Sequence, residues 1–328
     1  MCGITGFWGF KRSKDPISIL KNINDKLHHR GPDASGYWQD ESQAIFLGHR
    51  RLSIIDTSSN GEQPMRSGNG RYIISYNGEI YNFSELKKDL DNSETKISWK
   101  SESDTEVLLE LISLYGLKKA LTKIEGMFAF ALYDRQDRTL SFARDRMGEK
   151  PLYIWQSSNG IAFASELKAL RSHPDFKADI NLMSVQNYLN SGYISGDSSI
   201  FKNVTRLTPG HFITFAAPTQ SLQSKPYWEL SPKDPSENIA RNIDQISDEI
   251  DVLLRRIVKQ QMISDVPIGG FLSGGIDSSL IVAIMQSISS KNVNTFSIGF
   301  DNDDFNEAHH AQKAVSYTHL TLPTTPYV

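Results

Sequence analysis

The chain has 328 residues, of which 39% are hydrophobic and 22% charged, and its formal net charge is −3. These values are typical of a globular protein with more than one domain, and they give no electrostatic reason to expect nucleic acid or an anionic membrane as a partner. No apolar stretch approaches the roughly 18 residues of a membrane span, and the first residues do not have the form of a signal peptide. The single cysteine excludes an internal disulfide, so we expect a cytoplasmic protein.

The single cysteine, Cys2, directly precedes a predicted strand over 4–10. Removal of Met1 would give Cys2 a free α-amine, which titrates near ~8 and is therefore partly a neutral base at physiological pH. A side-chain nucleophile activated by the N-terminal amine is a known arrangement for acyl transfer. The alternative is a chance cysteine at a terminus or one packed in the core, and position alone does not decide between them.

A short amphipathic helix is predicted over 16–28, followed by His29-Arg30-Gly31-Pro32-Asp33. Gly-Pro breaks the helix, and Arg30 and Asp33 flank the resulting tight turn. A salt bridge between these two residues is one interpretation, and a direct role in catalysis is the other.

Two arginines, Arg50 and Arg51, interrupt an apolar strand predicted over 44–56. Alternation along a strand points them to opposite faces, so we expect one to be solvated and the other to point inward. An inward arginine requires an anion. A substrate carboxylate bound in a bidentate fork would supply it, and so would an internal acid.

Asn77-Gly78-Glu79 lies inside a strand pattern over 71–82. A glycine within a strand indicates a bulge or a close approach of the backbone to a ligand. Asn-Gly is also a strong hairpin signal, but the aromatic pattern continues on both sides. The side-chain amide of Asn77 and the backbone N–H of Gly78 are groups that suit an oxyanion hole.

Ser103-Asp104-Thr105-Glu106 has the form of a capping box before an apolar helix that stops at Gly116. Asp104 either compensates the helix dipole in the first turn or holds a substrate ammonium near the helix start.

From 124 onward the pattern changes to strands separated by turns. The charged segment 144–151 is interpreted as a solvated hairpin loop, and 173–230 as mostly irregular. The predicted elements are strands at 127–133, 139–145, 151–155, 160–165 and 212–215 and a short helix at 166–171.

Six motifs stand in the order found in class II glutamine amidotransferases, and more narrowly the chain resembles the glutamine-hydrolysing asparagine synthetases from residue 1 to about 314. The resemblance implies a four-layer αββα N-terminal-nucleophile sandwich that hydrolyses glutamine to glutamate and ammonia. The motifs are Met-Cys-Gly-Ile-Thr-Gly, His-Arg-Gly-Pro-Asp, Arg-Leu-Ser-Ile-Ile-Asp, Asn-Gly-Glu-Ile-Tyr-Asn, Ser-Asp-Thr-Glu and Gly-Met-Phe-Ala-Phe-Ala-Leu-Tyr-Asp.

Site residues follow from the same resemblance. Cys2 would be the nucleophile, and Asn77 and Gly78 would form the oxyanion hole. The glutamine pocket would consist of Arg51 for the carboxylate, the backbone of Leu52, Ser53, Ile54 and Ile55, the oxyanion-hole pair Asn77 and Gly78, and Glu79 and Asp104 for the ammonium group.

A second domain is predicted after a linker at 216–246. An amphipathic helix over 247–263, capped by Ser247, precedes a buried strand and then Ser273-Gly274-Gly275-Ile276-Asp277-Ser278-Ser279 at a helix start. Glycines and N-terminal helix amides form an anion nest, although a generic strand-to-helix turn is the alternative. No lysine follows the glycines, so this is not a Walker A loop.

This loop resembles the pyrophosphate loop of ATP pyrophosphatases. The resemblance implies ATP-dependent conversion of aspartate to asparagine through a β-aspartyl-AMP intermediate, with ATP and Mg²⁺ as cofactors, Asp277 binding magnesium–pyrophosphate, and glutamine, aspartate and ATP as the small-molecule partners. A homodimer is a possible assembly. The expected ATP contacts are Leu272, Ser273, Gly274, Gly275, Asp277, Ser278, Ser279 and Ile298.

Two alternatives to this function stay open. One is amidation of another carboxylate, such as a polysaccharide precursor, and the other is a glutaminase-only or non-catalytic remnant.

The expected domains are 1–215, 216–246 as linker and 247–314 as the incomplete start of a parallel-sheet ATP-binding domain. Residues 315–328 lack a helical period and are interpreted as a non-family tail. The family pattern would run to about twice this length, so we expect the printed chain to hydrolyse glutamine, bind ATP weakly and make no asparagine.

Overall fold

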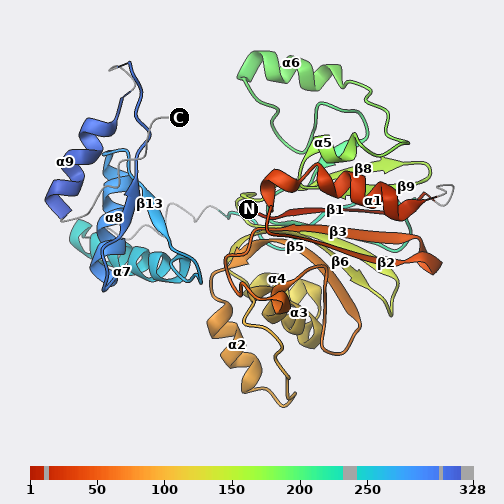
Figure 1. Cartoon of the computed structure of the whole chain (residues 1–328), viewed down its shortest axis with the longest axis horizontal. Coiled ribbons are helices and arrows are strands. Elements are labelled where there is room, and N and C mark those ends of the chain that lie inside the picture. Colours follow the sequence, from red (N-terminus) through yellow and green to blue (C-terminus); the bar gives the residue numbers. More distant parts are fainter. Residues whose placement is uncertain (11–14, 232–241, 303–305, 319–328) are drawn as a thin grey trace. The chain divides into compact units, whose positions relative to one another are not determined.

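The computed structural model describes residues 1–10, 15–231, 242–302 and 306–318. The chain forms two compact units, Met1–Leu230 and Ser231–Val328 (Figure 1). Within the described ranges, no helix is both long and apolar enough to cross a membrane.

Two six-stranded antiparallel sheets form the first unit. One has the order β10 (Val204–Arg206), β8 (Tyr153–Ser157), β9 (Gly160–Ala164), β1 (Gly3–Gly9), β3 (Ile45–Arg51) and β2 (Ala34–Asp40). The other has the order β12 (Lys225–Pro226), β11 (His211–Phe215), β7 (Thr139–Arg144), β6 (Gly126–Asp134), β5 (Tyr72–Ile80) and β4 (Met65–Arg66).

Helices cover the outer face of each sheet, as Figure 1 shows. On the β1 sheet, α1 (Pro16–Asp25) and α5 (Leu167–Leu170) pack through Leu20 and Ala169. The outer face of the β5 sheet is covered by α2 (Phe83–Asp91), α3 (Asp104–Tyr115) and α4 (Leu117–Lys123). The unit is therefore layered αββα, and its short 3-10 turns are His28–Arg30, Glu41–Gln43 and Ser59–Gly61.

The central core lies between the two sheets. Ile4 and Leu47 from one sheet pack in one cluster with Ala131 and Phe142 from the other, and each is fully buried. At about 25 cal/mol per Å² of apolar surface, this burial is the main term that holds the sheets together. It also fixes β1, and with it Cys2, in the middle of its sheet.

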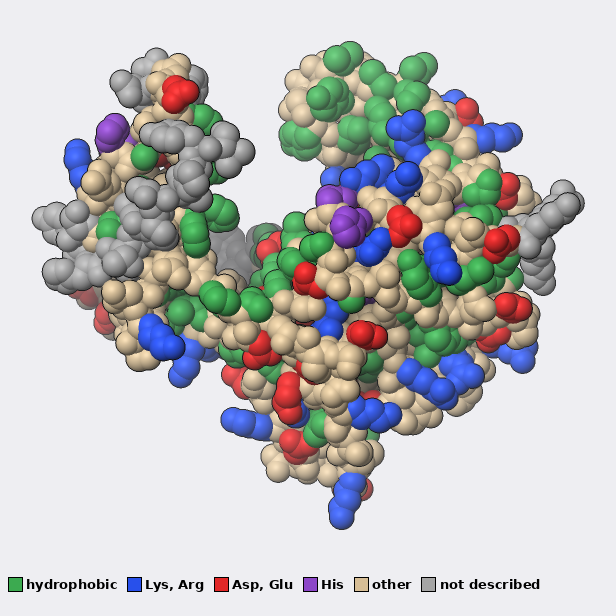
Figure 2. All heavy atoms as spheres, viewed as in Figure 1, with side chains coloured by type: hydrophobic (Ala, Val, Ile, Leu, Met, Phe, Trp, Pro, Cys, Tyr) green, Lys and Arg blue, Asp and Glu red, His purple; other side chains and the backbone are tan. Residues whose placement is uncertain are grey.

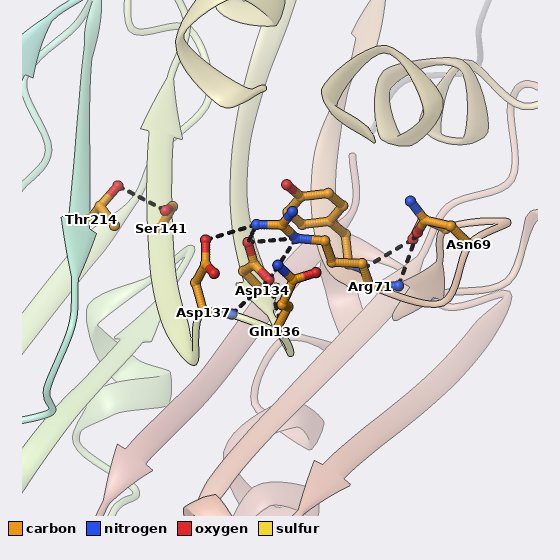
Figure 3. Close-up of polar contacts among 9 residues, drawn as sticks. Asn69, Arg71, Asp134, Gln136, Asp137, Ser141 and Thr214 are labelled. Carbon is orange, nitrogen blue, oxygen red and sulfur yellow. Dashed lines mark hydrogen bonds and ion pairs between the residues drawn. The ribbon is translucent and has the colours of Figure 1, made fainter. Parts of the chain in front are cut away.

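Polar contacts join neighbouring strands of the β5 sheet at the end where β5 begins (Figure 3). The Arg71 guanidinium, at the start of β5, donates to Asp134 at 2.6 Å and to Asp137 at 2.7 Å in the β6–β7 turn. Ser141 on β7 and Thr214 on β11 share a hydrogen bond of 2.9 Å. These bonds hold the strand register at the end of the sheet where β5 begins.

Several predicted boundaries in the first unit change. The first helix ends at Asp25, because a separate 3-10 turn occupies 28–30, and the strand expected to reach 56 ends at Arg51. The segment expected to be irregular contains a helix, α6 (Leu182–Ser191). Apolar side chains on α6 are exposed, including Leu182 and Leu189 at 76% each, and Figure 2 shows green apolar side chains on the surface of this helix.

The second unit contains α7 (Ile243–Gln261), β13 (Gly269–Phe271), α8 (Ile276–Ile288), β14 (Asn294–Phe296) and α9 (Ala308–Thr318). Its two strands pair in parallel, and a small core includes Leu272, Val282 and Met285. α7 begins four residues before the predicted cap because Asn242, not Ser247, accepts the N-cap bond. The predicted buried strand is largely uncovered, with Phe271 79% exposed.

Both predicted domain edges shift. The first unit extends to Leu230 rather than 215, because β12 pairs with β11 and the Tyr227 hydroxyl donates to the Arg144 carbonyl at 2.8 Å. At the other end, α9 continues past 314 to Thr318, and Val315 is buried in the small core. The expected change at 315 is therefore not seen in 315–318, and 319–328 lie outside the described residues.

Candidate active site

A pocket in the first unit forms where β1 begins, β3 and β5 end and α3 starts. It brings together nearly all residues that the sequence assigned to a glutamine site. The lining residues are Met1, Cys2, Arg51, Leu52, Ile54, Ile55, Gly61, Gln63, Tyr76, Asn77, Gly78, Glu79, Ser103, Asp104, Thr105, Met127 and Lys150. Ser53 is the one predicted member outside this lining.

Cys2 is held at the start of β1 by bonds to its backbone and its sulfur. The Arg30 Nε donates to the Cys2 carbonyl at 2.9 Å, and the Leu52 backbone N–H donates to the Cys2 Sγ at 3.4 Å. The Sγ is also 3.6 Å from the Leu52 carbonyl oxygen. Burial raises the pKa of the Cys2 thiol. The thiol therefore needs a base before it can act as a nucleophile.

Arg30 and Asp33 do not pair with each other, so the predicted turn salt bridge is wrong. Arg30 instead pairs with Glu166 at 3.0 Å, in addition to its bond to Cys2. Asp33 accepts the Ser53 backbone N–H at 2.8 Å. The turn thus supports two separate parts of the pocket, because one residue fixes the nucleophile and the other fixes the loop after β3.

Alternation along β3 separates the two arginines as predicted. Arg50 lies on the outer face and pairs with Asp25 at 2.5 Å, but its side chain is 14% exposed and so is not solvated as expected. Arg51 is 6% exposed and lines the pocket. The Arg51 guanidinium donates to the carbonyl oxygens of Ser58, at 2.7 Å, and Asp56. Carbonyl oxygens orient a guanidinium without neutralising its charge, so Arg51 is suited to bind an anion.

Asn77 and Gly78 lie inside a continuous strand, which excludes the hairpin alternative. Asn77 is paired with Ala129 and Gly78 with Phe128 of β6, without a bulge. A Cβ at Gly78 would lie 2.2 Å from the Met127 carbonyl oxygen. The neighbouring strand therefore requires this glycine, whereas we expected a bulge or the approach of a ligand to require it.

The side chain of Asn77 is 1% exposed, and within the described part of the chain neither its Oδ1 nor its Nδ2 has a hydrogen-bond partner. A buried amide without a partner costs about 1–3 kcal/mol. Because Asn77 lines the pocket together with Cys2, its free donor is available to an oxygen atom of a bound molecule.

Two acids, Asp104 and Glu79, share the pocket. The Asp104 carboxylate accepts the Ile80 backbone N–H at 2.8 Å and the Tyr76 hydroxyl at 3.0 Å. Burial raises the pKa of Asp104, and burial followed by the Asp104 charge raises the pKa of Glu79.

The capping box before α3 is only half formed. Ser103 accepts the Thr105 N–H at 3.1 Å, as a cap should. Glu106 does not reach back to Ser103 and instead accepts the N–H groups of Lys100 and Ser101, at 3.0 and 2.7 Å. The segment before α3 is therefore fixed by Glu106, which places Asp104 firmly at the pocket.

Several lining residues were not predicted. Gly61 and Gln63 come from the loop after β3, and Gln63 accepts the Tyr76 N–H at 2.7 Å. Lys150 comes from the charged loop that was expected to be solvated, yet it is 4% exposed. The charges around Lys150 favoured a solvated interpretation, and no local pattern marked it as buried.

The predicted phosphate loop of the second unit lies between β13 and α8. Gly274 has a φ of +84°, and a Cβ there would meet His310 of α9 at 2.5 Å. The Ser273 and Ser278 hydroxyls are 3.0 Å apart. The N-cap of α8 is Gly275, without a side-chain cap, so the first helical amides are open to an anion.

Leu272 is buried beside this loop, whereas Ile298 is 67% exposed. Asp277 lies in the first turn of α8. Among the described residues there is no cluster of three or more His, Cys, Asp or Glu side chains that would hold a metal ion. A magnesium ion at Asp277 would therefore depend on phosphate oxygens for most of its ligands.

Comparison with known proteins gives two family matches along the chain. The glutamine amidotransferase domain family matches residues 1–228, and the asparagine synthase family matches residues 249–325. The chain belongs to the glutamine amidotransferase family. Its remaining part carries a partial asparagine synthase domain, and this match extends past 314, where the sequence resemblance was expected to end.

Two curated relatives and one solved structure are similar to this amidotransferase. Asparagine synthetase [glutamine-hydrolyzing] 1 of Bacillus subtilis is 34% identical over 96% of this chain and 48% of its own length. Amidase chry2 of Gibberella zeae is 31% identical over 88% of this chain and 43% of its own length. The chain thus spans about half the length of these relatives.

The solved structure is described as the allosteric regulatory enzyme of purine biosynthesis. The two sequences are 18% identical, the match covers 100% of this chain and 66% of the other chain, and the TM-score is 0.50. At this identity the similarity concerns the fold alone.

Proposed function

We propose that the first unit hydrolyses glutamine to glutamate and ammonia, with Cys2 as the nucleophile. The observation that carries this proposal is the unpartnered, buried amide of Asn77 in the pocket of Cys2. Such a donor is suited to an oxygen that becomes negatively charged only during the reaction.

The chemistry follows from the groups at the pocket. After removal of Met1, the Cys2 α-amine accepts the thiol proton, directly or through water, and the thiolate attacks the side-chain amide carbon of glutamine. The oxyanion that forms accepts hydrogen bonds from the Asn77 Nδ2 and the Gly78 N–H. The proton then passes to the leaving nitrogen, ammonia departs, and water hydrolyses the thioester to glutamate and free thiol.

The two ends of the substrate match the charges of the pocket. Arg51 binds the α-carboxylate in a bidentate fork, while Glu79 and Asp104 receive the α-ammonium group. The backbone of Leu52, Ile54 and Ile55 completes the wall. This division of charge selects a free amino acid over a peptide, whose amide groups carry neither charge.

For the complete protein we propose ATP-dependent conversion of aspartate to asparagine, with ammonia from glutamine. The family match over 249–325 and the name of the Bacillus subtilis relative support it. The α8 amides with Ser273, Ser278 and Ser279 would hold a phosphate group of ATP, and Asp277 would face its Mg²⁺. ATP supplies the adenylyl group that activates a carboxylate.

A second candidate function is amidation of a different carboxylate. The relative named amidase chry2 is also similar over most of this chain, so relatives with different names share the amino-terminal half. Assaying the full-length protein for pyrophosphate release with aspartate and with other carboxylates separates the two functions.

The glutaminase proposal is tested by measuring glutamate release from glutamine. Cys2→Ala is expected to lower the rate at least about a thousandfold, because no other thiol is present in the chain. Retention of Met1, obtained by blocking its removal during expression, is expected to have the same effect because the amine becomes an amide. Activity that survives Cys2→Ala in a folded variant would contradict the proposal.

A further inference from the structure

Three charged residues at the loop between β7 and β8 are buried, although the sequence of this loop favours a solvated hairpin. Arg144 is 6%, Asp145 0% and Lys150 4% exposed. The β6–β7 turn shows the contrast, since the Asp137 side chain, paired with Arg71, is 57% exposed (Figure 3). The proposed chemistry uses none of the three buried charges, so their burial needs another reason.

Asp145 organises the loop through its carboxylate. It accepts four backbone N–H groups, and the buried charge is thereby compensated by hydrogen bonds. The donors are Phe128 at 3.2 Å, Met147 at 3.1 Å, Glu149 at 3.0 Å and Lys150 at 3.0 Å. The loop therefore has one fixed shape, and the backbone N–H of Lys150 is part of it.

Arg144 fixes the same loop by donating hydrogen bonds to backbone carbonyl groups. The Arg144 guanidinium donates to the carbonyl oxygens of Lys150 at 2.8 Å, Leu207 at 2.7 Å and Gly148 at 2.5 Å. Lys150 is therefore held at both its N–H and its carbonyl. A side chain that starts from so rigid a backbone is preorganised.

This preorganised side chain points into the glutaminase pocket. Lys150 lines it together with Cys2, Glu79 and Asp104, and its Nζ lies 3.1 Å from the Met1 Sδ. A thioether is a weak acceptor, whereas a buried ammonium group requires a strong one. Burial lowers the pKa of Lys150, and the first of the charges that oppose this lowering is that of Glu79, an acid of the same pocket wall.

The charges around Glu79 come from three elements. Asp104 on α3 raises the pKa of Glu79, after the larger effect of burial, while Lys150 and the amine at the start of β1 lower it. After burial, the charges of Glu79, Glu149 and Asp145 raise the pKa of Lys150, and that of Arg30 lowers it. Burial and the Asp104 charge raise the pKa of Glu79. Without Lys150, only the amino-terminal charge would lower it.

We propose that Lys150 is a positioning residue of the glutaminase, whose ammonium group holds Glu79 as the anion that receives the ammonium group of glutamine. The inference rests on the proposed glutaminase function. Lys150 itself does not touch the reacting atoms, so its effect is on substrate binding. Binding that is equal in the ground and transition states changes KM and leaves kcat unchanged.

The test compares Lys150→Met, Lys150→Arg and Lys118→Met in the full chain. Lys118 is an exposed lysine on α4 and serves as the matched control. Lys150→Met is expected to raise the KM for glutamine at least about tenfold at pH 7, with kcat within about twofold. Its acid limb in kcat/KM should move to higher pH, because loss of a neighbouring cation raises a carboxyl pKa. Lys150→Arg should restore both values.

A second measurement needs no activity. Carbon NMR follows the Glu79 carboxyl through a pH titration, with Glu79→Gln used to assign its signal. The carboxyl pKa should be higher in Lys150→Met than in the parent. An unchanged pKa, or a KM like the parent's in an active Lys150→Met, overturns the role of Lys150. A parent that titrates as expected but releases no glutamate overturns the proposed function alone.

Discussion

The sheets of the two units are covered to different extents. In the first unit helices cover both outer faces, and residues such as Ile4 and Phe142 are completely buried between the sheets. In the second unit a pair of three-residue strands leaves Phe271 and Ile298 mostly exposed. A parallel sheet needs cover on both faces. The pocket of the first unit is therefore built from rigid parts, whereas the phosphate loop rests on a small support.

The largest expected consequence is in hydrogen exchange. Amides of β5 lie between paired strands in a covered sheet, whereas those of β13 have one partner strand, so protection should differ between them. We expect β5 to exchange at least about a thousandfold more slowly, which corresponds to roughly 4 kcal/mol. Mass spectrometry of peptides from the full chain measures both. Equal protection would contradict the difference in cover between the two sheets.

Acid should weaken the first unit specifically. Burial lowers the pKa of His49 to about 4 and that of His173 to about 4, against an ordinary value of 6.5. Stability from these neutral rings is complete above pH 6.5 and is lost as pH falls toward 4, because only the unfolded chain binds the protons. The loss should be about 2 kcal/mol per histidine at pH 5.

Tryptophan fluorescence during urea unfolding measures this loss. All 5 tryptophans lie at or before Trp228, so the signal reports the first unit. Phe7, Phe10 and Trp155 surround His173, so His173→Phe should remove part of the pH dependence. The matched control is His28→Ala at an exposed position. A midpoint that is the same at pH 7 and pH 5 would contradict the assignment.

The smallest expected effect tests the pocket itself. Arg51→Lys keeps the charge but loses the planar fork, so the KM for glutamine should rise about tenfold, or about 1.4 kcal/mol. Arg50→Lys is the control, because Arg50 faces outward and pairs with Asp25. Steady-state kinetics with glutamine measure both variants. If Arg50→Lys raised the KM and Arg51→Lys did not, the two faces of β3 would be assigned the wrong way round.

Local patterns were sufficient for much of the first unit. Alternation along β3 predicted that Arg50 and Arg51 face apart, and the interrupted strand pattern drew attention to Asn77. The alternation succeeds because side-chain direction in a strand depends on the next few residues only. The role of Asn77 stays a prediction.

Other features depend on contacts between distant residues. Arg30 pairs with Glu166, and Asp145 gathers the N–H groups of a loop and of Phe128. A run of charges looks the same in sequence whether water or backbone amides surround it, which is why Lys150 was missed. Gly78 was singled out for a bulge or a ligand, whereas the Met127 carbonyl that requires a glycine there lies on another strand.

The position of β1 has a consequence for synthesis. β1 carries the first residues of the chain, yet one of its two partner strands is Gly160–Ala164, and Ser165 binds the Ile4 N–H. Ribosomes add about 5–20 residues per second, so β1 waits roughly 10 to 30 s for that partner to be made. During this interval β1 has only its other partner, β3, which ends at Arg51, and the side that receives β9 stays open. The sheet can therefore close around β1 only after half of the 328 residues have been made.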